Sequence, residues 1–209
     1  MACNHLLQRK WMLFFSICLV LTACTTLPPP QEVDDICRIF KQYPRWHQYA
    51  RDVESRWKVP IPIQMAIIHQ ESKFDGTARP ARKKLLWVIP WRRPSTAYGY
   101  SQALNSTWAL YKGSPEGGGA WASRTNFFDS VDFVGWYANQ ASIRAAIPRY
   151  DAYRLYLAYH EGIGGYTRKT YLAKPWLIRV AQKVKHLSQV FEKQLNQCPV
   201  PPRPHFWSR

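Results

Sequence analysis

Residues 61–74 read IPIQMAIIHQESKF and carry the clearest structural signal of the sequence. Proline is tolerated in the first turn of a helix, so the segment predicts a helix from Pro62 to about Ser72. Ile63, Ile67 and Glu71 lie at i, i+4 and i+8 and therefore share one face. A carboxylate that extends an apolar face is costly unless it is paired or has a chemical task, and partial burial raises its pKa toward the range of a general acid. The alternative is that the helix end points outward and Glu71 meets solvent or a lysine.

Apolar residues recur at helical rather than strand spacing through most of the remaining chain. The clearest stripe combines Trp46, Ala50, Val53 and Trp57 at steps of three and four. Residues 73–98, with three prolines, are expected to be irregular. The other expected helices span residues 32–42, 106–112, 130–146 with Asp129 as N-cap, 151–160, and a last one from Pro175. The fold class is therefore mainly α.

The composition indicates one folded domain with a polyanionic neighbour. The chain has 209 residues, 15% of them aromatic, and a formal net charge of +16. So many aromatic and aliphatic residues can bury enough surface to fold, which excludes intrinsic disorder. The charge alone leaves nucleic acid, an anionic membrane surface and an acidic cell-wall polymer open as partners.

The N-terminus predicts export. Residues 1–23 begin with the charges of Arg9 and Lys10 and continue in a short apolar run, which is typical of a secretory signal peptide and too short to cross a bilayer. The alternative is a buried N-terminal helix. Leu21-Thr22-Ala23-Cys24 resembles the lipobox of bacterial lipoproteins, so Cys24 is expected to be acylated and to anchor the chain in a lipid bilayer. Export then excludes nucleic acid as a partner.

The remaining organisation follows from cysteines and prolines. Residues 24–31 are expected to form a lipidated linker, 32–198 the folded domain and 199–209 a proline-rich tail. Cys37 and Cys198 remain after the signal and lipid cysteines are set aside, and an oxidising compartment allows them to form a disulfide. Two separate buried thiols are the alternative.

Several familiar signatures are missing from the sequence. It has no phosphate-binding glycine loop, and its six histidines lack metal-ligand spacing. Residues 162–165 follow an expected helix rather than a strand, so their glycines do not predict a dinucleotide turn. We therefore expect no cofactor and no metal.

Three motifs resemble those of one family when they are taken in order. The segment 69–74 around Glu71 resembles the Glu-Ser motif of soluble-lytic-transglycosylase domains, which share a fold with goose-type lysozyme. Residues 98–102 look like the family's Gly-Leu-Met-Gln motif, and 158–162 look like its Ala-Tyr-Asn-x-Gly motif. The longer string around Tyr159 looks like a lipoprotein branch of these domains. The resemblance implies a goose-type, lysozyme-like helical domain with an irregular insertion between the first two motifs.

The resemblance also implies roles for individual residues. Glu71 corresponds to the single acid/base, and Tyr159 to a tyrosine that hydrogen-bonds this carboxylate or the sugar. Gln102 and the backbone of Gly99 correspond to groove-lining positions. The remaining candidate substrate contacts are Ser72, Ser95, Tyr100, Ser101, His160 and Glu161.

The sequence departs from the family pattern at several positions. Pro80 stands where the family has a serine, so Ser95 or Thr96 is expected to take that role. Ser101 replaces the usual methionine, and His160 replaces the usual asparagine. Glu161 adds a second carboxylate, which would favour hydrolysis if it were catalytic and otherwise has a structural or ion-pairing role.

The insertion between Arg79 and Arg93 is basic and aromatic and contains no acidic residue. One interpretation is a groove wall that binds sugar faces and peptide carboxylates. A second is contact with an anionic membrane surface. A third is a loop that covers the core and has solvated charges. Its cations are Arg79, Arg82, Lys83, Lys84, Arg92 and Arg93, interleaved with Trp87 and Trp91.

Together these observations predict a monomeric lipoprotein that cleaves the MurNAc–GlcNAc bond of peptidoglycan and leaves 1,6-anhydromuramyl ends. Thr25 after the lipobox cysteine favours the outer membrane of a Gram-negative cell, facing the periplasm. The alternatives are a hydrolysing muramidase with the same site, a non-catalytic peptidoglycan-binding lipoprotein, and a basic domain that binds anionic lipid through residues 79–93.

Overall fold

The computed structural model describes residues 26–82, 84–85, 89–90 and 93–198. The expected signal peptide, the lipobox cysteine Cys24 and the tail 199–209 lie outside the described residues. The same holds for five residues of the insertion besides Lys83, including both of its tryptophans.

Helix α4 (Ile61–Ser72) occupies the interior, and every residue from Ile61 to His69 is buried. A helix with apolar residues on all sides is stable only when other elements cover every side, because its whole apolar surface must be buried. The fully buried Gln64 of this helix uses its Nε2 to donate to the carbonyls of Ala50 (3.1 Å) and Val59 (2.7 Å), while its Oε1 has no partner among the described residues. The helix ends at Lys73, whose left-handed backbone (φ 52°) turns the chain away.

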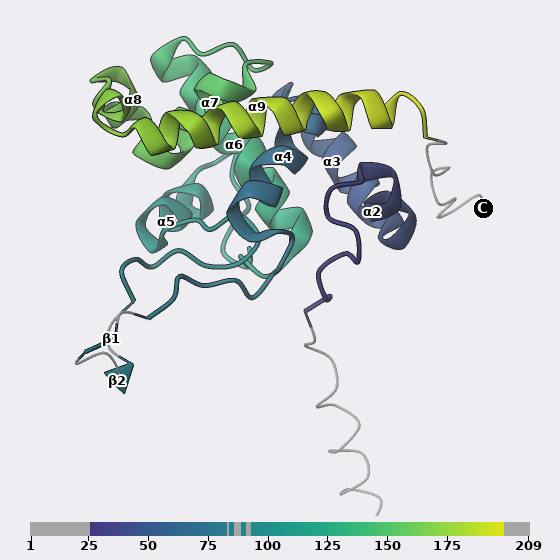
Figure 1. Cartoon of the computed structure of the whole chain (residues 1–209), viewed down its shortest axis with the longest axis horizontal. Coiled ribbons are helices and arrows are strands. Elements are labelled where there is room, and N and C mark those ends of the chain that lie inside the picture. Colours follow the sequence, from purple (N-terminus) through teal and green to yellow (C-terminus); the bar gives the residue numbers. More distant parts are fainter. Residues whose placement is uncertain (1–25, 83, 86–88, 91–92, 199–209) are drawn as a thin grey trace, which may run out of the picture.

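Three long helices enclose α4. Helix α9 (Pro175–Leu195) packs along it, and α3 (Pro44–Trp57) and α6 (Phe127–Ala145) pack on its other sides. Helix α7 (Ala152–Glu161) packs against α9 in turn, and Figure 1 shows α9 running across the molecule over α4, α6 and α7. The end of α4 is thereby brought next to α6 and α7.

The shorter elements are α2 (Ile36–Gln42), α5 (Asn105–Gly113), α8 (Ile163–Thr167) and the 3-10 turn η2 (Thr170–Ala173). Within the insertion, β1 (Lys84–Leu85) pairs antiparallel with β2 (Ile89–Pro90), and this pair lies away from the helices (Figure 1). The mainly α fold class is confirmed. No helix in the described ranges is both long and apolar enough to cross a membrane.

Two helix starts differ from the sequence prediction. Helix α2 begins at Ile36 rather than at residue 32, because the Asp35 carboxylate accepts the Cys37 (2.9 Å) and Arg38 (3.1 Å) amides. Helix α6 begins at Phe127, with Asn126 as its N-cap. Asp129, the expected N-cap, lies in the first turn, where its carboxylate accepts the Ser123 amide (2.8 Å).

A buried carboxylate joins α3, α5 and α6. Asp132 of α6 accepts hydrogen bonds from the Trp57 indole and the Tyr111 hydroxyl, both at 2.7 Å. One turn of α6 further on, a Cβ at Gly135 would lie 2.6 Å from both Trp57 and Val53, so α3 and α6 approach closely only because this residue is glycine. These contacts fix the face of α6 that reaches the candidate site.

The segment that precedes α2 is attached to the helical body. The Tyr43 hydroxyl donates to the Pro28 carbonyl (2.7 Å), and the Gln42 amide oxygen accepts from the backbone of Gln31 (3.1 Å). The part of the expected linker that the structure describes therefore lies against the start of the folded domain.

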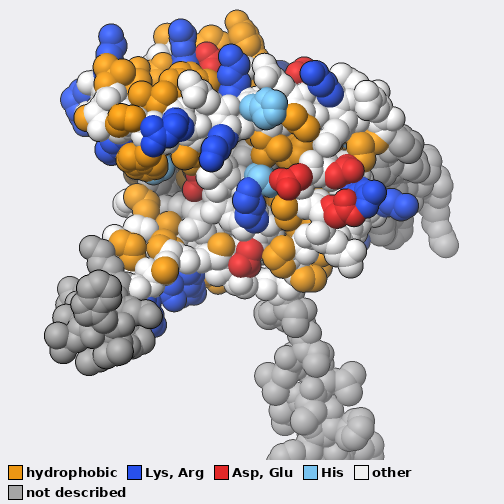
Figure 2. Space-filling model, in the orientation of Figure 1, with side chains coloured by type: hydrophobic (Ala, Val, Ile, Leu, Met, Phe, Trp, Pro, Cys, Tyr) orange, Lys and Arg blue, Asp and Glu red, His pale blue; other side chains and the backbone are white. Residues whose placement is uncertain are grey.

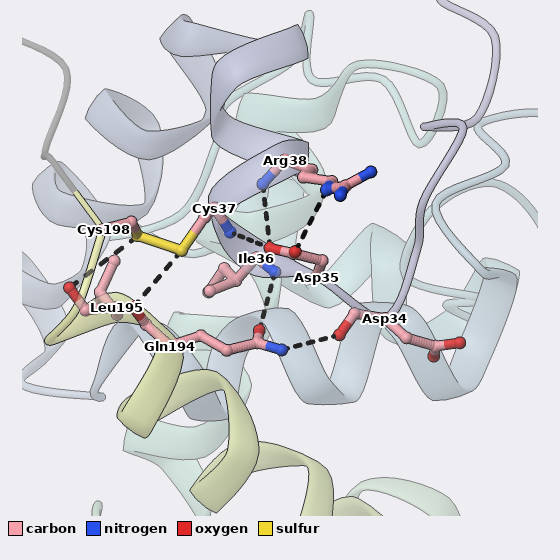
Figure 3. Close-up of a disulfide and its surroundings, with 8 residues drawn as sticks. All are labelled: Asp34, Asp35, Ile36, Cys37, Arg38, Gln194, Leu195 and Cys198. Carbon is pink, nitrogen blue, oxygen red and sulfur yellow. Dashed lines mark hydrogen bonds and ion pairs between the residues drawn. A yellow bond between two sulfur atoms is a disulfide. The ribbon is translucent and has the colours of Figure 1, made fainter.

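The two ends of the folded domain are covalently joined (Figure 3). A disulfide links Cys37 of α2 to Cys198, which follows α9, with their Cα atoms 5.7 Å apart and 161 positions apart in sequence. Beside it, Gln194 accepts from the Ile36 amide (3.0 Å) and donates to the Asp34 carbonyl (3.2 Å). The long helix α9 is thus fixed to α2 at its C-terminal end.

Replacing both cysteines by serine is expected to lower the free energy of unfolding by about 2–5 kcal/mol, because the closed loop spans most of the domain. Denaturant unfolding followed by circular dichroism measures this loss. Reduction of the wild-type protein should reproduce it, whereas equal stability of the oxidised, reduced and double-serine forms would contradict the prediction.

Candidate active site

A cleft of about 430 Å³ opens at the end of α4. It brings together residues from all three sequence motifs, namely Glu71, Gln102 and the segment from Tyr159 to Gly162. Phe133 and Tyr137 of α6 form another part of its wall. Its volume and its mixed apolar and polar lining are typical of a ligand-binding pocket.

Glu71 is the carboxylate that the structure places between core and cleft. Its side chain is half-buried, and its Oε1 atom is shielded from solvent without a hydrogen-bond partner among the described residues. Burial raises the pKa of Glu71 to about 7, although the Tyr156 hydroxyl acts on the carboxyl group in the opposite direction. A carboxyl group with this pKa is present in both its protonated and its ionised form near neutral pH, so it is able both to donate and to accept a proton.

Two tyrosines of α7 lie near Glu71, whereas the family resemblance assigned only Tyr159 a hydrogen bond to this carboxylate or to the sugar. The Tyr159 hydroxyl donates to the Ser101 carbonyl (2.6 Å), so it connects the third motif to the second instead of bonding Glu71. Tyr156, one turn earlier, is buried and interacts with the Glu71 carboxyl group. Burial and the neighbouring Glu71 raise the pKa values of both phenols. Sequence reasoning missed Tyr156, and the available signal was its i, i+3 spacing from Tyr159.

The second motif contributes Gln102 to the cleft, whereas Gly99, Tyr100 and Ser101 lie behind the wall. The Gln102 amide donates to the carbonyls of Ala78 (2.9 Å) and Gly99 (2.8 Å). Gly99 has φ +75°, and a Cβ there would lie 2.0 Å from a backbone oxygen of the next loop. Tyr100 and Ser101 are buried. The motif therefore shapes the wall, and Gln102 alone among these four lines it.

The two serine candidates near the site have different positions. Ser72 is buried, and its hydroxyl donates back to the Ile68 carbonyl (3.2 Å) within α4. Ser95 lines the cleft, where its hydroxyl accepts from the Ala97 amide (3.3 Å). Thr96 accepts from the Asn105 amide (3.0 Å) and thereby holds the start of α5. Of Ser95 and Thr96, the structure places Ser95 in the cleft lining.

The second carboxylate of the cleft is engaged by three partners. Glu161 accepts from the Lys174 ammonium (2.7 Å) and the Thr170 hydroxyl (2.6 Å), and His160 lies 3.4 Å away. Burial by itself would raise the pKa of Glu161, but the hydrogen bonds from Lys174, Thr170 and His160 outweigh it and lower the pKa. The environments of Glu71 and Glu161 therefore shift the pKa values of these two carboxyl groups in opposite directions within one cleft.

The model of the transglycosylase SLT domain family matches residues 12–198. The chain belongs to this family. Comparison with curated proteins and with solved structures gives no significant match.

Membership in the SLT family confirms the family expected from the three motifs and makes the protein a peptidoglycan lytic transglycosylase, which is a lyase. The helical architecture agrees with the lysozyme-like fold of SLT domains. In the described part of the chain, no group of three or more His, Cys, Asp or Glu side chains is arranged to hold a metal ion.

The raised pKa of Glu71 makes the stability of this SLT domain depend on pH. The stabilising contribution of the neutral carboxyl is complete below 4.5, the ordinary pKa of a glutamate, and is lost as pH rises through about 7. Relative to Glu71→Gln, which stays neutral, the wild-type free energy of unfolding should therefore fall by about 3 kcal/mol between these limits. Urea unfolding at both ends of the range measures the difference. Glu192→Gln, the same change on the exposed surface of α9, should show no such divergence.

Tyr156→Phe should raise the pKa of Glu71 further, because the hydroxyl that stabilises the ionised carboxylate is lost. We expect the midpoint in a carbon-13 NMR titration of labelled glutamate to move up by roughly one pH unit. Tyr159→Phe also removes a phenolic hydroxyl, but that hydroxyl is bound to the Ser101 carbonyl. This substitution should therefore move the titration midpoint of Glu71 less. The reverse order would contradict the assignment of Tyr156.

Proposed function

We propose that Glu71 is the single acid/base with which this transglycosylase cleaves the MurNAc–GlcNAc bond and forms 1,6-anhydromuramyl ends. The observation that carries the proposal is the Glu71 carboxyl group, which faces a cleft of glycan-binding size yet has a shielded oxygen with no partner in the described ranges. A substrate that enters the cleft can supply the hydrogen-bond partner that this oxygen lacks.

The raised pKa suits both halves of the reaction. Protonated Glu71 donates its proton to the glycosidic oxygen, which leaves with the electron pair of the broken bond. The carboxylate then accepts the proton of the muramyl 6-hydroxyl, whose oxygen bonds to the anomeric carbon. Glu71 is protonated again at the end, and no water is consumed. A group whose pKa of about 7 lies near neutral pH can perform both transfers with small driving forces.

The state of Glu161 supports intramolecular attack over hydrolysis. Most glycosidases need a second carboxylate as nucleophile or as base toward water. In this cleft the second carboxylate is 4% exposed and bound by Lys174 and Thr170, so its oxygens already have partners. With one carboxyl group left for proton transfer, the 6-hydroxyl of the substrate itself is the available nucleophile.

The proposal includes the place of action. The lipobox ending at Cys24 and the following Thr25 support a lipoprotein in the outer membrane of a Gram-negative cell, facing the periplasm, and the proposal takes this lipoprotein to be a monomer. There the substrate is a peptidoglycan strand, and the cationic charge of the domain suits its carboxylates.

Glu71→Gln should lower the release of muropeptides from purified sacculi by at least about a hundredfold, because general acid–base catalysis contributes on this scale. Chromatography with mass detection should find anhydro ends in the wild-type digest. Glu192→Gln, the same substitution on the surface of α9, serves as the matched control and should keep wild-type activity.

Each alternative has its own outcome in this digest. Reducing ends in place of anhydro ends would identify a hydrolysing muramidase. Equal release by wild type and Glu71→Gln would remove Glu71 from the mechanism. Glycan binding without turnover by either protein would identify a non-catalytic binding protein.

A further inference from the structure

One wall of the cleft is backed by the first residues of α9. His160, which lines the cleft, packs edge-on against the Trp176 indole with ring centroids 5.1 Å apart. Glu161, also in the lining, is bound by the Lys174 ammonium at 2.7 Å. Two separate contacts therefore place Lys174 and Trp176 next to the cleft, beyond the residues of the three motifs.

Both residues remain available to a ligand. Trp176 is 45% exposed and the Lys174 side chain 41% exposed. An ammonium group has three hydrogen-bond donors, and the bond to Glu161 uses one of them. An exposed indole beside a cation is a surface that contacts an apolar face and a carboxylate at the same time.

The stretch of chain that forms this rim is rich in cations, of which Lys174 is paired with Glu161. Residues 162–191 contain no Asp or Glu, and all of them lie in the part that the structure describes. Figure 2 shows hydrophobic and Lys or Arg side chains interleaved at the upper left, over α8 and the start of α9. The cations of this stretch are Arg168, Lys169, Lys174, Arg179, Lys183 and Lys185. An anionic group is therefore favoured at this rim of the cleft.

We propose that His160, Lys174 and Trp176 form a rim subsite that binds the peptide substituent of the glycan strand. The Lys174 ammonium binds a peptide carboxylate, and the exposed indole face of Trp176 packs against the apolar part of the peptide. His160 holds the indole in place from the cleft side. The inference rests on the proposed function, since it takes the cleft as the glycan site.

The subsite gives Glu161 a positioning role. Its carboxylate fixes the Lys174 ammonium at the cleft wall, while Thr170 fixes the other carboxylate oxygen. A lysine without this anchor would have to be ordered at each binding event, which costs side-chain entropy. The ion pair orders the lysine before the ligand arrives, so binding loses less entropy.

The test measures binding rather than turnover, so that it does not depend on catalysis. The full chain with Glu71→Gln is titrated with soluble glycan strands that keep their peptides and with strands freed of peptide by an amidase. Adding Lys174→Gln or Trp176→Ala should weaken binding of the peptide-bearing strands about tenfold and change binding of the peptide-free strands less than about twofold. Lys174→Arg, which keeps the charge, should restore most of the affinity.

Lys193→Gln is the matched control, because it removes the same charge from the exposed last turn of α9, the helix that Lys174 precedes. It should leave both affinities unchanged. Equal weakening of both kinds of strand by Lys174→Gln and Trp176→Ala, or no weakening of either, would overturn the subsite. Failure of the proposed function shows separately, as absence of anhydro ends from the wild-type digest.

Discussion

The desolvation of one carboxyl group is the constraint on which the site depends. Glu71 stands at the end of a helix that is buried on all sides, so its acid group inherits a low-dielectric environment from the packing of α4. The elements that pack around the end of α4 therefore contribute to the pKa of Glu71. Since burial is a property of the whole domain, the chemistry of this residue and the stability of the fold are two results of the same packing.

The long-range hydrogen bonds around Glu71 explain how distant motifs form one cleft. Tyr159 binds the Ser101 carbonyl, and Tyr137 of α6 binds the Ala158 carbonyl (3.1 Å). Each bond joins a phenol of one element to the backbone of another, so the geometry depends on main-chain positions more than on flexible side chains. The motif residues that lie behind the wall, such as Tyr100, act by holding this frame.

The sequence was sufficient to predict those features that depend on a local pattern of residues. The helical period from Ile63 to Glu71 predicted both α4 and the exceptional position of the acid, and these two features determine the site. It was insufficient where the outcome depends on residues far apart in the chain. The i, i+3 spacing places Tyr156 on the same face of α7 as Tyr159, but only the packing of the helices brings it to the Glu71 carboxyl group. Likewise the sequence predicted Asp129 as the N-cap of α6, but Asn126 caps the helix. The Asp129 carboxylate instead accepts a hydrogen bond from the Ser123 amide.

The hydrogen bond between Tyr43 and the Pro28 carbonyl attaches the described end of the linker to the folded domain. With Cys24 acylated, as proposed, four residue steps separate the lipid-bearing residue from this contact at Pro28. Four extended residues span roughly 14 Å, far less than the whole linker would. Under this proposal the domain stays close to the bilayer and cleaves the part of the wall nearest to it. The attachment at Pro28 also restricts how the domain is oriented relative to the bilayer.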